Sequence, residues 1–139
     1  MNAKILVLDD EESIRFSFHR FLTAQGYEVT TAASYSEALA SMDETHFDLI
    51  LADIILGDGY GINILQEVLH RILKTRVIIM TAYPTTETVH NSFRLKAFDY
   101  LIKPLCQDGL LGAVNMVMEH LGDGVGEVSG RRSLALSNC

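Results

Sequence analysis

The feature that most constrains this chain is a nearly unbroken apolar stretch, Phe47 to Ala52, that ends in the carboxylate of Asp53. The stretch is far too short to cross a membrane, and its residues do not alternate with polar ones as in a half-exposed strand. Followed by Gly57, it predicts a fully buried strand that delivers Asp53 to a loop at its carboxyl end, where open parallel sheets bind ligands. Taken alone, Asp53 could equally cap a turn or a helix.

Four further strand patterns alternate with helical patterns along the chain. Strands are expected at 4–8, 27–32, 76–81 and 98–102 in addition to the stretch that ends at Asp53. Apolar residues at helical spacing predict helices that start near residues 13, 34, 62, 85 and 107. Five strands that alternate with five helices favour an α/β fold, in which a parallel sheet is covered on both faces by right-handed crossovers.

Two helix ends and the end of the chain carry specific expectations. Ser13 is the candidate N-cap of the first helix, and Ile72 is expected on the core-facing stripe of the third. The last helix is expected to end near Leu121. From Gly122 onward the periodicity is lost, so residues 1–121 are expected to form the domain and residues 122–139 a disordered linker or a non-native tail.

The composition limits the function classes. A chain of 139 residues with 48% hydrophobic residues suits one domain, and its net charge of −7 disfavours direct binding to nucleic acid or anionic membranes. No apolar run approaches the roughly 20 residues of a membrane span, and no signal peptide precedes the first strand, so a cytoplasmic protein is expected. Cys106 and Cys139 lack metal-ligand or redox spacing and are expected to stay thiols.

Polar residues follow four of the five expected strands. Asp9 and Asp10 follow the first, Asp53 the third, Thr81 the fourth and Lys103 the fifth. Parallel strands would bring all of them to one edge, where close carboxylates repel one another unless a cation such as Mg²⁺ joins them. The lysine and the hydroxyl could hold a tetrahedral anion. This set predicts phosphoryl transfer to Asp53, although each residue taken singly could be a helix cap or a solvated charge.

Four segments resemble the signature blocks of the response-regulator receiver domain of two-component signalling. They are Lys4 to Glu12, Asp48 to Asp53, Val77 to Ala82 and Phe98 to Pro104. The resemblance covers residues 3 to 121 and implies a flavodoxin-like, doubly wound sheet with strand order 2-1-3-4-5. The last block also resembles receivers attached to transcription activators, so this chain could be the N-terminal part of such a regulator or a stand-alone receiver.

The resemblance implies roles for the acidic residues. Asp53 would accept a phosphoryl group from a histidine kinase or a phosphotransfer protein. Mg²⁺ would be bound by Asp9, Asp10 and Asp53 and by the backbone carbonyl of Ile55. Such a protein is a switch with limited self-phosphorylation and self-dephosphorylation, not a turnover enzyme.

The resemblance also implies what surrounds the phosphoryl group. Thr81, Ala82 and Lys103 would contact it, and a cis peptide would join Lys103 to Pro104. Tyr100 would turn inward as Thr81 engages the phosphoryl group. The fourth helix, fifth strand and fifth helix would then form the switch face, which is also a possible homodimer contact.

The expected switch face carries charged residues particular to this chain. His90, Arg94 and Lys96, with Asp99 nearby, are plausible partner contacts on that face or an ordinary solvated surface. Lys96 stands where a glycine often ends the fourth helix, and a left-handed residue there would cost roughly 1 kcal/mol.

The loop after Asp53 departs from the family pattern. Leu56 to Gly61 replaces the usual Met-Pro pair, so the loop is expected to be flexible and to become ordered only with metal or phosphate bound. Ile55 and Tyr83 occupy the two positions that tune the phosphate lifetime. Neither can orient water, so slow self-dephosphorylation is expected.

Three other functions remain as alternatives. A haloacid-dehalogenase-like phosphatase uses the same residue types, but its nucleophile lies on the first strand. A flavodoxin-like FMN binder would need a phosphate-binding loop after the first strand, which Asp9 to Glu12 does not provide. An unphosphorylated receiver-like interaction module is disfavoured by the complete acidic set.

Overall fold

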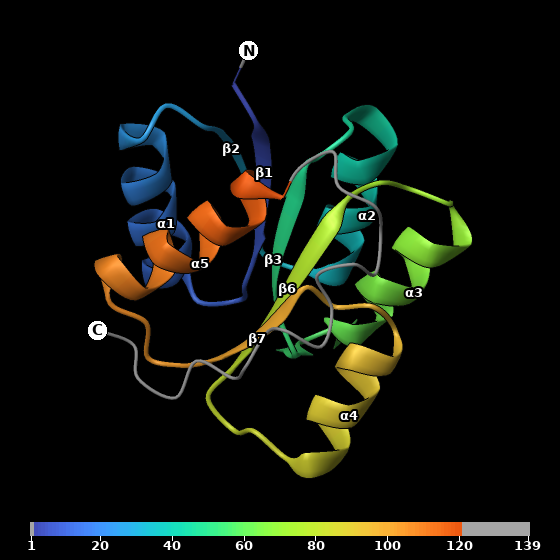
Figure 1. Cartoon of the computed structure of the whole chain (residues 1–139). Coiled ribbons are helices and arrows are strands. Elements are labelled where there is room, and N and C mark those ends of the chain that lie inside the picture. The colour runs from blue at the N-terminus through green and yellow to red at the C-terminus, as the bar shows by residue number, and fades with distance from the viewer. Residues whose placement is uncertain (1, 121–139) are drawn as a thin grey trace.

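The computed structural model describes residues 2–120, which form a five-stranded parallel sheet with helices on both faces (Figure 1). The sheet strands are β1 (Lys4–Leu8), β2 (Glu28–Ala32), β3 (Leu49–Asp53), β6 (Arg76–Thr81) and β7 (Asp99–Ile102). Their spatial order is β2-β1-β3-β6-β7. This is the predicted order 2-1-3-4-5, because β4 (Ile55–Leu56) and β5 (Gly59–Tyr60) form a separate hairpin.

Within residues 2–120, five helices cover the sheet as the alternating pattern predicts. They are α1 (Glu12–Ala24), α2 (Tyr35–Glu44), α3 (Ile62–His70), α4 (Thr86–Arg94) and α5 (Gln107–Glu119). Helices α1 and α5 lie on one face, and α2, α3 and α4 lie on the other (Figure 1). The flavodoxin-like α/β architecture is therefore confirmed.

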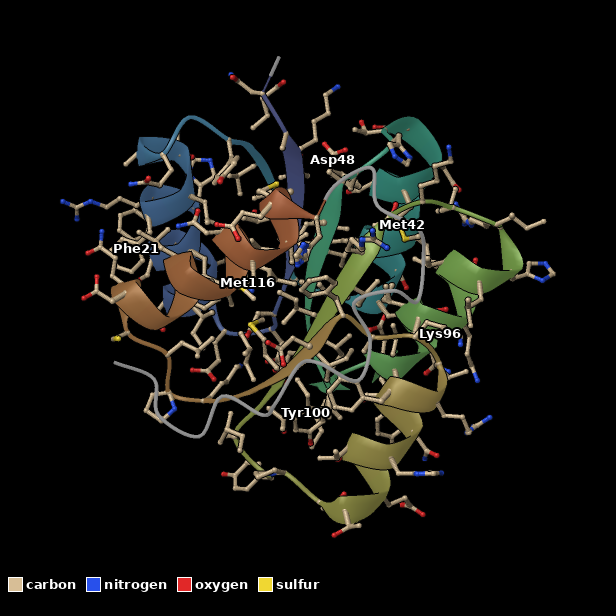
Figure 2. The ribbon with its side chains drawn as sticks, in the orientation of Figure 1. Phe21, Met42, Asp48, Lys96, Tyr100 and Met116 are labelled. Carbon is tan, nitrogen blue, oxygen red and sulfur yellow. The ribbon has the colours of Figure 1, made fainter. Side chains whose placement is uncertain are left out.

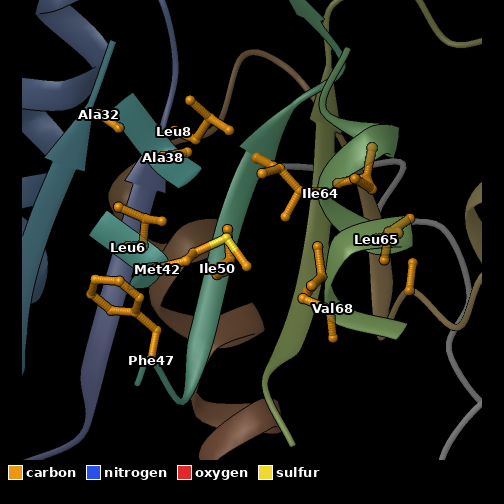
Figure 3. Packing of buried hydrophobic residues seen from close by; sticks show 14 of the residues in the cluster. Leu6, Leu8, Ala32, Ala38, Met42, Phe47, Ile50, Ile64, Leu65 and Val68 are labelled. Atoms are coloured by element: carbon orange, nitrogen blue, oxygen red, sulfur yellow. The ribbon is translucent and has the colours of Figure 1, made fainter. Parts of the chain in front are cut away.

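The core has two halves, one on each side of the sheet. Strand residues Leu6, Leu8 and Ile50 point toward Ala38 and Met42 of α2 and toward Ile64, Leu65 and Val68 of α3 (Figure 3). Alternate strand residues point to the other face, where they meet Phe18, Leu22, Leu110, Val114 and Val117 of α1 and α5. All five residues of β3 are buried, which is why its sequence is a continuous apolar run.

The third helix ends earlier than its sequence pattern predicts. Its last residue is His70, and Ile72 has φ 57° and is 88% exposed, so the expectation that Ile72 faces the core was wrong. The amide N–H groups of Ile72 and Leu73 donate to Leu69 O and Val68 O, which is the arrangement of a left-handed helix end. Ile72 therefore lies on the turn after the helix and away from the stripe.

The start of α1 differs from the sequence prediction, whereas the end of α4 agrees with it. Helix α1 begins at Glu12 after an N-cap residue, Glu11, whose side chain makes no capping hydrogen bond, so Ser13 is not the cap. Lys96, after α4, has φ 74°, so this turn does keep a left-handed residue without glycine. Its side chain extends away from the molecule (Figure 2).

The cysteine and tail expectations have mixed outcomes. Cys106 is disulfide-bonded in the structure, so the expectation of a thiol there was wrong, and its sulfur also accepts a hydrogen bond from the amide of Gly109 at the start of α5. The expectations for Cys139 and for a tail from residue 122 lie outside the described residues. Among residues 2–120, no helix has the length and apolar character needed to cross a membrane.

Candidate functional site

Three carboxylates meet where β1 and β3 end. The two strands pair in parallel with Leu8 opposite Ala52, so the next residues, Asp9 and Asp53, are neighbours at the same edge. One oxygen from each of Asp9, Asp10 and Asp53 lies within 4.8 Å of the others. Asp9 and Asp53 are buried and Asp10 is exposed, so the cluster opens to solvent on one side.

Lys103 supplies the positive charge of the site. Its Nζ donates a hydrogen bond to Asp9 Oδ2 over 2.6 Å and lies 3.3 Å from Asp53 Oδ2. The Lys103 amide donates to the carbonyl of Thr81, and the peptide bond between Lys103 and Pro104 is cis. These backbone features direct the lysine from the end of β7 to the acidic cluster.

The ionisation of the site reflects burial and this lysine. Burial raises the pKa of Asp53, and the neighbouring charges of Asp9 and Asp10 add to the rise, while Lys103 opposes it. Burial would lower the pKa of Lys103, but the hydrogen bond and charge of Asp9, with the charge of Asp53, outweigh it, so the pKa of Lys103 is raised. The lysine is therefore held as a cation between two carboxylates.

A cavity of about 190 Å³ lies above Asp53. Its lining residues are Asp10, Glu11, Asp53, Ile55, Thr81, Ala82, Tyr83 and Lys103. Thr81 is 1% exposed, and its hydroxyl oxygen accepts a hydrogen bond from the amide of Tyr83. Every residue expected to touch the metal or the phosphoryl group thus lines this cavity, except Asp9, whose carboxylate is paired with Lys103.

The donor set fits a hard divalent cation. Three carboxylates with close oxygen atoms are the ligand type that Mg²⁺ prefers, and the cluster is open enough for it to keep waters. Both oxygens of Asp9 already accept hydrogen bonds, one from the Glu11 amide at 2.9 Å and one from Lys103. Each oxygen of a carboxylate can accept more than one partner, so Asp9 can still contribute a metal ligand, and Asp10 is exposed.

The loop after Asp53 is ordered by contacts that the sequence analysis did not predict. Ile55 pairs with Tyr60 and Leu56 with Gly59 in the hairpin of β4 and β5. At its tip, the carboxylate of Asp58 accepts hydrogen bonds from α2. Asp58 finds these partners more than 20 residues away in sequence, and the expectation that the loop becomes ordered only with metal or phosphate bound stays a prediction.

Tyr100 already points inward. It is fully buried beneath α4, and its hydroxyl lies 2.7 Å from the hydroxyl of Thr88 (Figure 2). Thr88 in turn forms a capping box with Thr85 at the start of α4. The role of Thr88 was missed because a partner 12 residues away leaves no local sequence signal.

The expected switch face is partly as predicted. His90, Arg94 and Lys96 are exposed on or just after α4. Asp99 is only 9% exposed, and one of its carboxylate oxygens accepts a hydrogen bond from the amide of Tyr100. The expectation that Asp99 joins this charged surface was therefore wrong.

Comparisons with known proteins identify the family of this chain. A sequence profile of the family described as "Response regulator receiver domain" matches residues 5–115. The transcriptional regulatory protein ZraR of Escherichia coli K12 is 37% identical over 119 residues, which cover 86% of this chain and 27% of ZraR. The alginate biosynthesis transcriptional regulatory protein AlgB of Pseudomonas aeruginosa is 36% identical over 108 residues, which cover 78% of this chain and 24% of AlgB.

A solved structure gives the same result for the fold. The CheY-like response regulator receiver domain protein of Methanospirillum hungatei JF-1 superposes with a TM-score of 0.82 at 31% identity. The match covers 89% of this chain and 100% of that one. In contrast, the chain spans only about a quarter of the length of the two regulatory proteins.

Proposed function

The chain belongs to the response regulator receiver domain family, and we propose that Asp53 is its phosphoacceptor, with Mg²⁺ as the cofactor. Receiver domains are phosphorylation-dependent signalling switches of two-component systems and are not turnover enzymes. The observation that carries the proposal is the position of Asp53, which lies at the end of a buried strand with two further carboxylates and Lys103 around it.

The proposed reaction moves a phosphoryl group from a donor to Asp53. A carboxylate oxygen of Asp53 forms a bond to phosphorus while the bond between phosphorus and the donor's histidine nitrogen breaks. The electron pair stays on that nitrogen, which then takes up a proton. Lys103, the Thr81 hydroxyl and the backbone amide of Ala82 would hold the phosphoryl oxygens, since all three residues line the cavity.

The metal would be held by residues that the structure brings to this edge of the sheet. We propose that it is held by Asp9, Asp10, Asp53 and the backbone carbonyl of Ile55. Mg²⁺ held there would neutralise negative charge on the phosphoryl oxygens. Small phosphate donors are expected to react as well, which is the limited self-phosphorylation of a receiver.

Phosphorylation would be read out on the face made by α4, β7 and α5. Thr81 would turn its hydroxyl to the phosphoryl group, and the inward position of Tyr100 would then be favoured. We propose that this face contacts an output domain or a second copy of the chain. The relatives named as transcriptional regulators support a receiver within a longer transcription activator.

The other proposals follow from the family and the charge. The donor is a histidine kinase or a phosphotransfer protein. With a net charge of −7, this domain is not expected to bind nucleic acid or a membrane itself, and we place it in the cytoplasm. We also propose that residues 1–121 form the receiver domain and that residues 122–139 are a linker or a non-native tail.

The lifetime of the phosphate is proposed to be long. Ile55 and Tyr83 line the mouth of the cavity, and neither carries a carboxylate or an amide side chain that could orient an attacking water. An apolar rim excludes water from the acyl phosphate and so slows hydrolysis.

Incubation with acetyl phosphate tests the function. Wild-type protein with Mg²⁺ is expected to gain one phosphoryl group by intact mass, and both Asp53→Asn and removal of Mg²⁺ with a chelator are expected to prevent this. Asp48→Asn is the matched control, because Asp48 lies just before the same strand and accepts a hydrogen bond from the Lys4 amide, far from the cavity. Labelling of Asp53→Asn would refute the assignment, and steady hydrolysis of acetyl phosphate without labelled protein would favour a phosphatase.

A further inference from the structure

The tip of the β4–β5 hairpin is fastened to the first turn of α2. The carboxylate of Asp58 accepts hydrogen bonds from the amides of Tyr35 at 2.8 Å and Ser36 at 3.1 Å, and from the Ser36 hydroxyl at 2.7 Å. These amides are the first two of α2, which have no partner within the helix. The Ser36 hydroxyl, followed by the two amides, lowers the pKa of Asp58, so the carboxylate is charged near neutral pH.

A packing contact strengthens the same attachment. A side chain at Gly59 would meet the ring of Tyr35 at 3.5 Å, so the hairpin tip lies directly on that ring. The other end of the hairpin is fixed as well, because the Gly61 amide donates to the carbonyl of Ile54 over 2.7 Å. The hairpin is therefore held at both ends, and Ile55 lies between them.

The attachment has a consequence for the cavity. Ile55 is paired with Tyr60 in the hairpin, so the direction of its backbone carbonyl is set by the hairpin as a whole. The segment contains Gly57, Gly59 and Gly61, whose backbone freedom would otherwise allow many positions for this carbonyl. Hydrogen bonds from amides and a hydroxyl to a carboxylate are stronger than those between neutral groups, and the helix N-terminus favours the charge.

We propose that Asp58 is a positioning residue for phosphoryl transfer: through α2 it holds the hairpin so that the Ile55 carbonyl is directed at the metal. The inference rests on the proposed function, since it gives that carbonyl a role in binding Mg²⁺. Asp58 itself touches neither the metal nor the phosphoryl group. Its nearest alternative role is that of an additional N-terminal cap that stabilises α2 alone.

The two roles are separated by a matched capping variant. Ser34 is the N-cap of α2, and its hydroxyl accepts a hydrogen bond from the Glu37 amide without touching the hairpin. Ser34→Ala therefore weakens the start of α2 in a similar way and leaves the hairpin attached. Ser36→Ala removes one of the three hydrogen bonds to Asp58 and is expected to give an intermediate effect.

The measurement is the Mg²⁺ dissociation constant of the whole, unphosphorylated chain by isothermal titration calorimetry. Asp58→Asn should weaken Mg²⁺ binding about tenfold, as is usual for residues that orient metal ligands. Ser34→Ala should lower the urea midpoint as Asp58→Asn does but keep the wild-type affinity. With saturating Mg²⁺, Asp58→Asn should be labelled by acetyl phosphate at the wild-type maximal rate, so that only the Mg²⁺ requirement changes.

The results separate this inference from the proposed function. Equal Mg²⁺ affinities of Asp58→Asn and wild type, or an equal loss in Ser34→Ala, would overturn the positioning role. If wild type binds Mg²⁺ but Asp53 is not labelled, the phosphoacceptor proposal fails and the calorimetric comparison still decides the role of Asp58. If wild type does not bind Mg²⁺, both proposals are wrong.

Discussion

Replacement of Thr88 by valine tests whether this hydroxyl holds Tyr100 in its inward position. Valine has nearly the same shape, so the change removes the hydroxyl and leaves the packing. The Tyr100 side chain is fully buried and its hydroxyl lies 2.7 Å from the hydroxyl of Thr88. A buried polar group that loses its partner costs about 1–3 kcal/mol.

Part of the stability lost in Thr88→Val comes from the start of α4, since Thr88 also forms the capping box with Thr85. A double-mutant cycle with Tyr100→Phe removes this contribution, because the cap is lost equally in both backgrounds. The remaining coupling between the two hydroxyls should be about 1 kcal/mol. This lowers the equilibrium constant for the inward position of Tyr100 about fivefold, and beryllofluoride affinity should fall by up to the same factor if the activated form needs Tyr100 inward.

The assay is urea unfolding of wild type, the two single variants and the double variant. Unfolding is monitored by circular dichroism because the chain has no tryptophan. Thr88→Ser keeps a hydroxyl and should retain most of the coupling. A coupling energy below about 0.3 kcal/mol, the level at which independent sites simply add, would refute the idea that Thr88 holds Tyr100.

Three further predictions concern stability and chemistry. Ile72→Gly should raise the free energy of unfolding by about 1 kcal/mol, because Ile72 has φ 57° and buries little; an unchanged urea midpoint would argue against strain there. Asp53→Asn should be more stable than wild type at neutral pH without metal. Burial raises the pKa of Asp53 in the folded state, so the free energy of unfolding of wild type falls as the pH rises from the ordinary Asp value of 3.8 through the raised pKa. Below pH 3.8, wild type and Asp53→Asn should therefore have nearly equal stability. A constant difference between them across a pH series of unfolding curves would contradict this. Ile55→Asn should speed decay of the phosphorylated form, followed by intact mass, and an unchanged decay rate would show that the apolar rim does not limit hydrolysis.

The features that the sequence predicted well are those encoded within one element. Most sheet strands are short apolar runs, so the parallel sheet could be anticipated and the polar residues after the runs could be placed at one edge, whereas the strand order came from the resemblance to receiver domains. That placement brought together Asp9, Asp53 and Lys103, although 94 residues separate the first from the last. Parallel pairing alone accounts for this, because equal ends of the strands must meet.

The features that were missed depend on pairs of residues distant in sequence. The hairpin of β4 and β5 has strands of two residues each and three nearby glycines, which is too short for a periodic pattern. The attachment of Asp58 to α2 and the contact of Thr88 with Tyr100 join separate elements. Ile72 was placed on the wrong surface because the helical pattern continues for two residues after the helix has ended.

The start of α3 places a geometric limit on how the sequence near the phosphoacceptor can vary. A side-chain carbon at Gly61 would overlap the carbonyl oxygen of Asp53, whereas one at Gly57 would meet no atom within 4 Å. Saturation mutagenesis should therefore deplete every substitution of Gly61 and tolerate many at Gly57. Insertions at the tip of the β4–β5 hairpin would leave the close approach of Gly61 to Asp53 unchanged. Variation in hairpin length can therefore change the residues that line the cavity while the contact between Gly61 and Asp53 stays fixed.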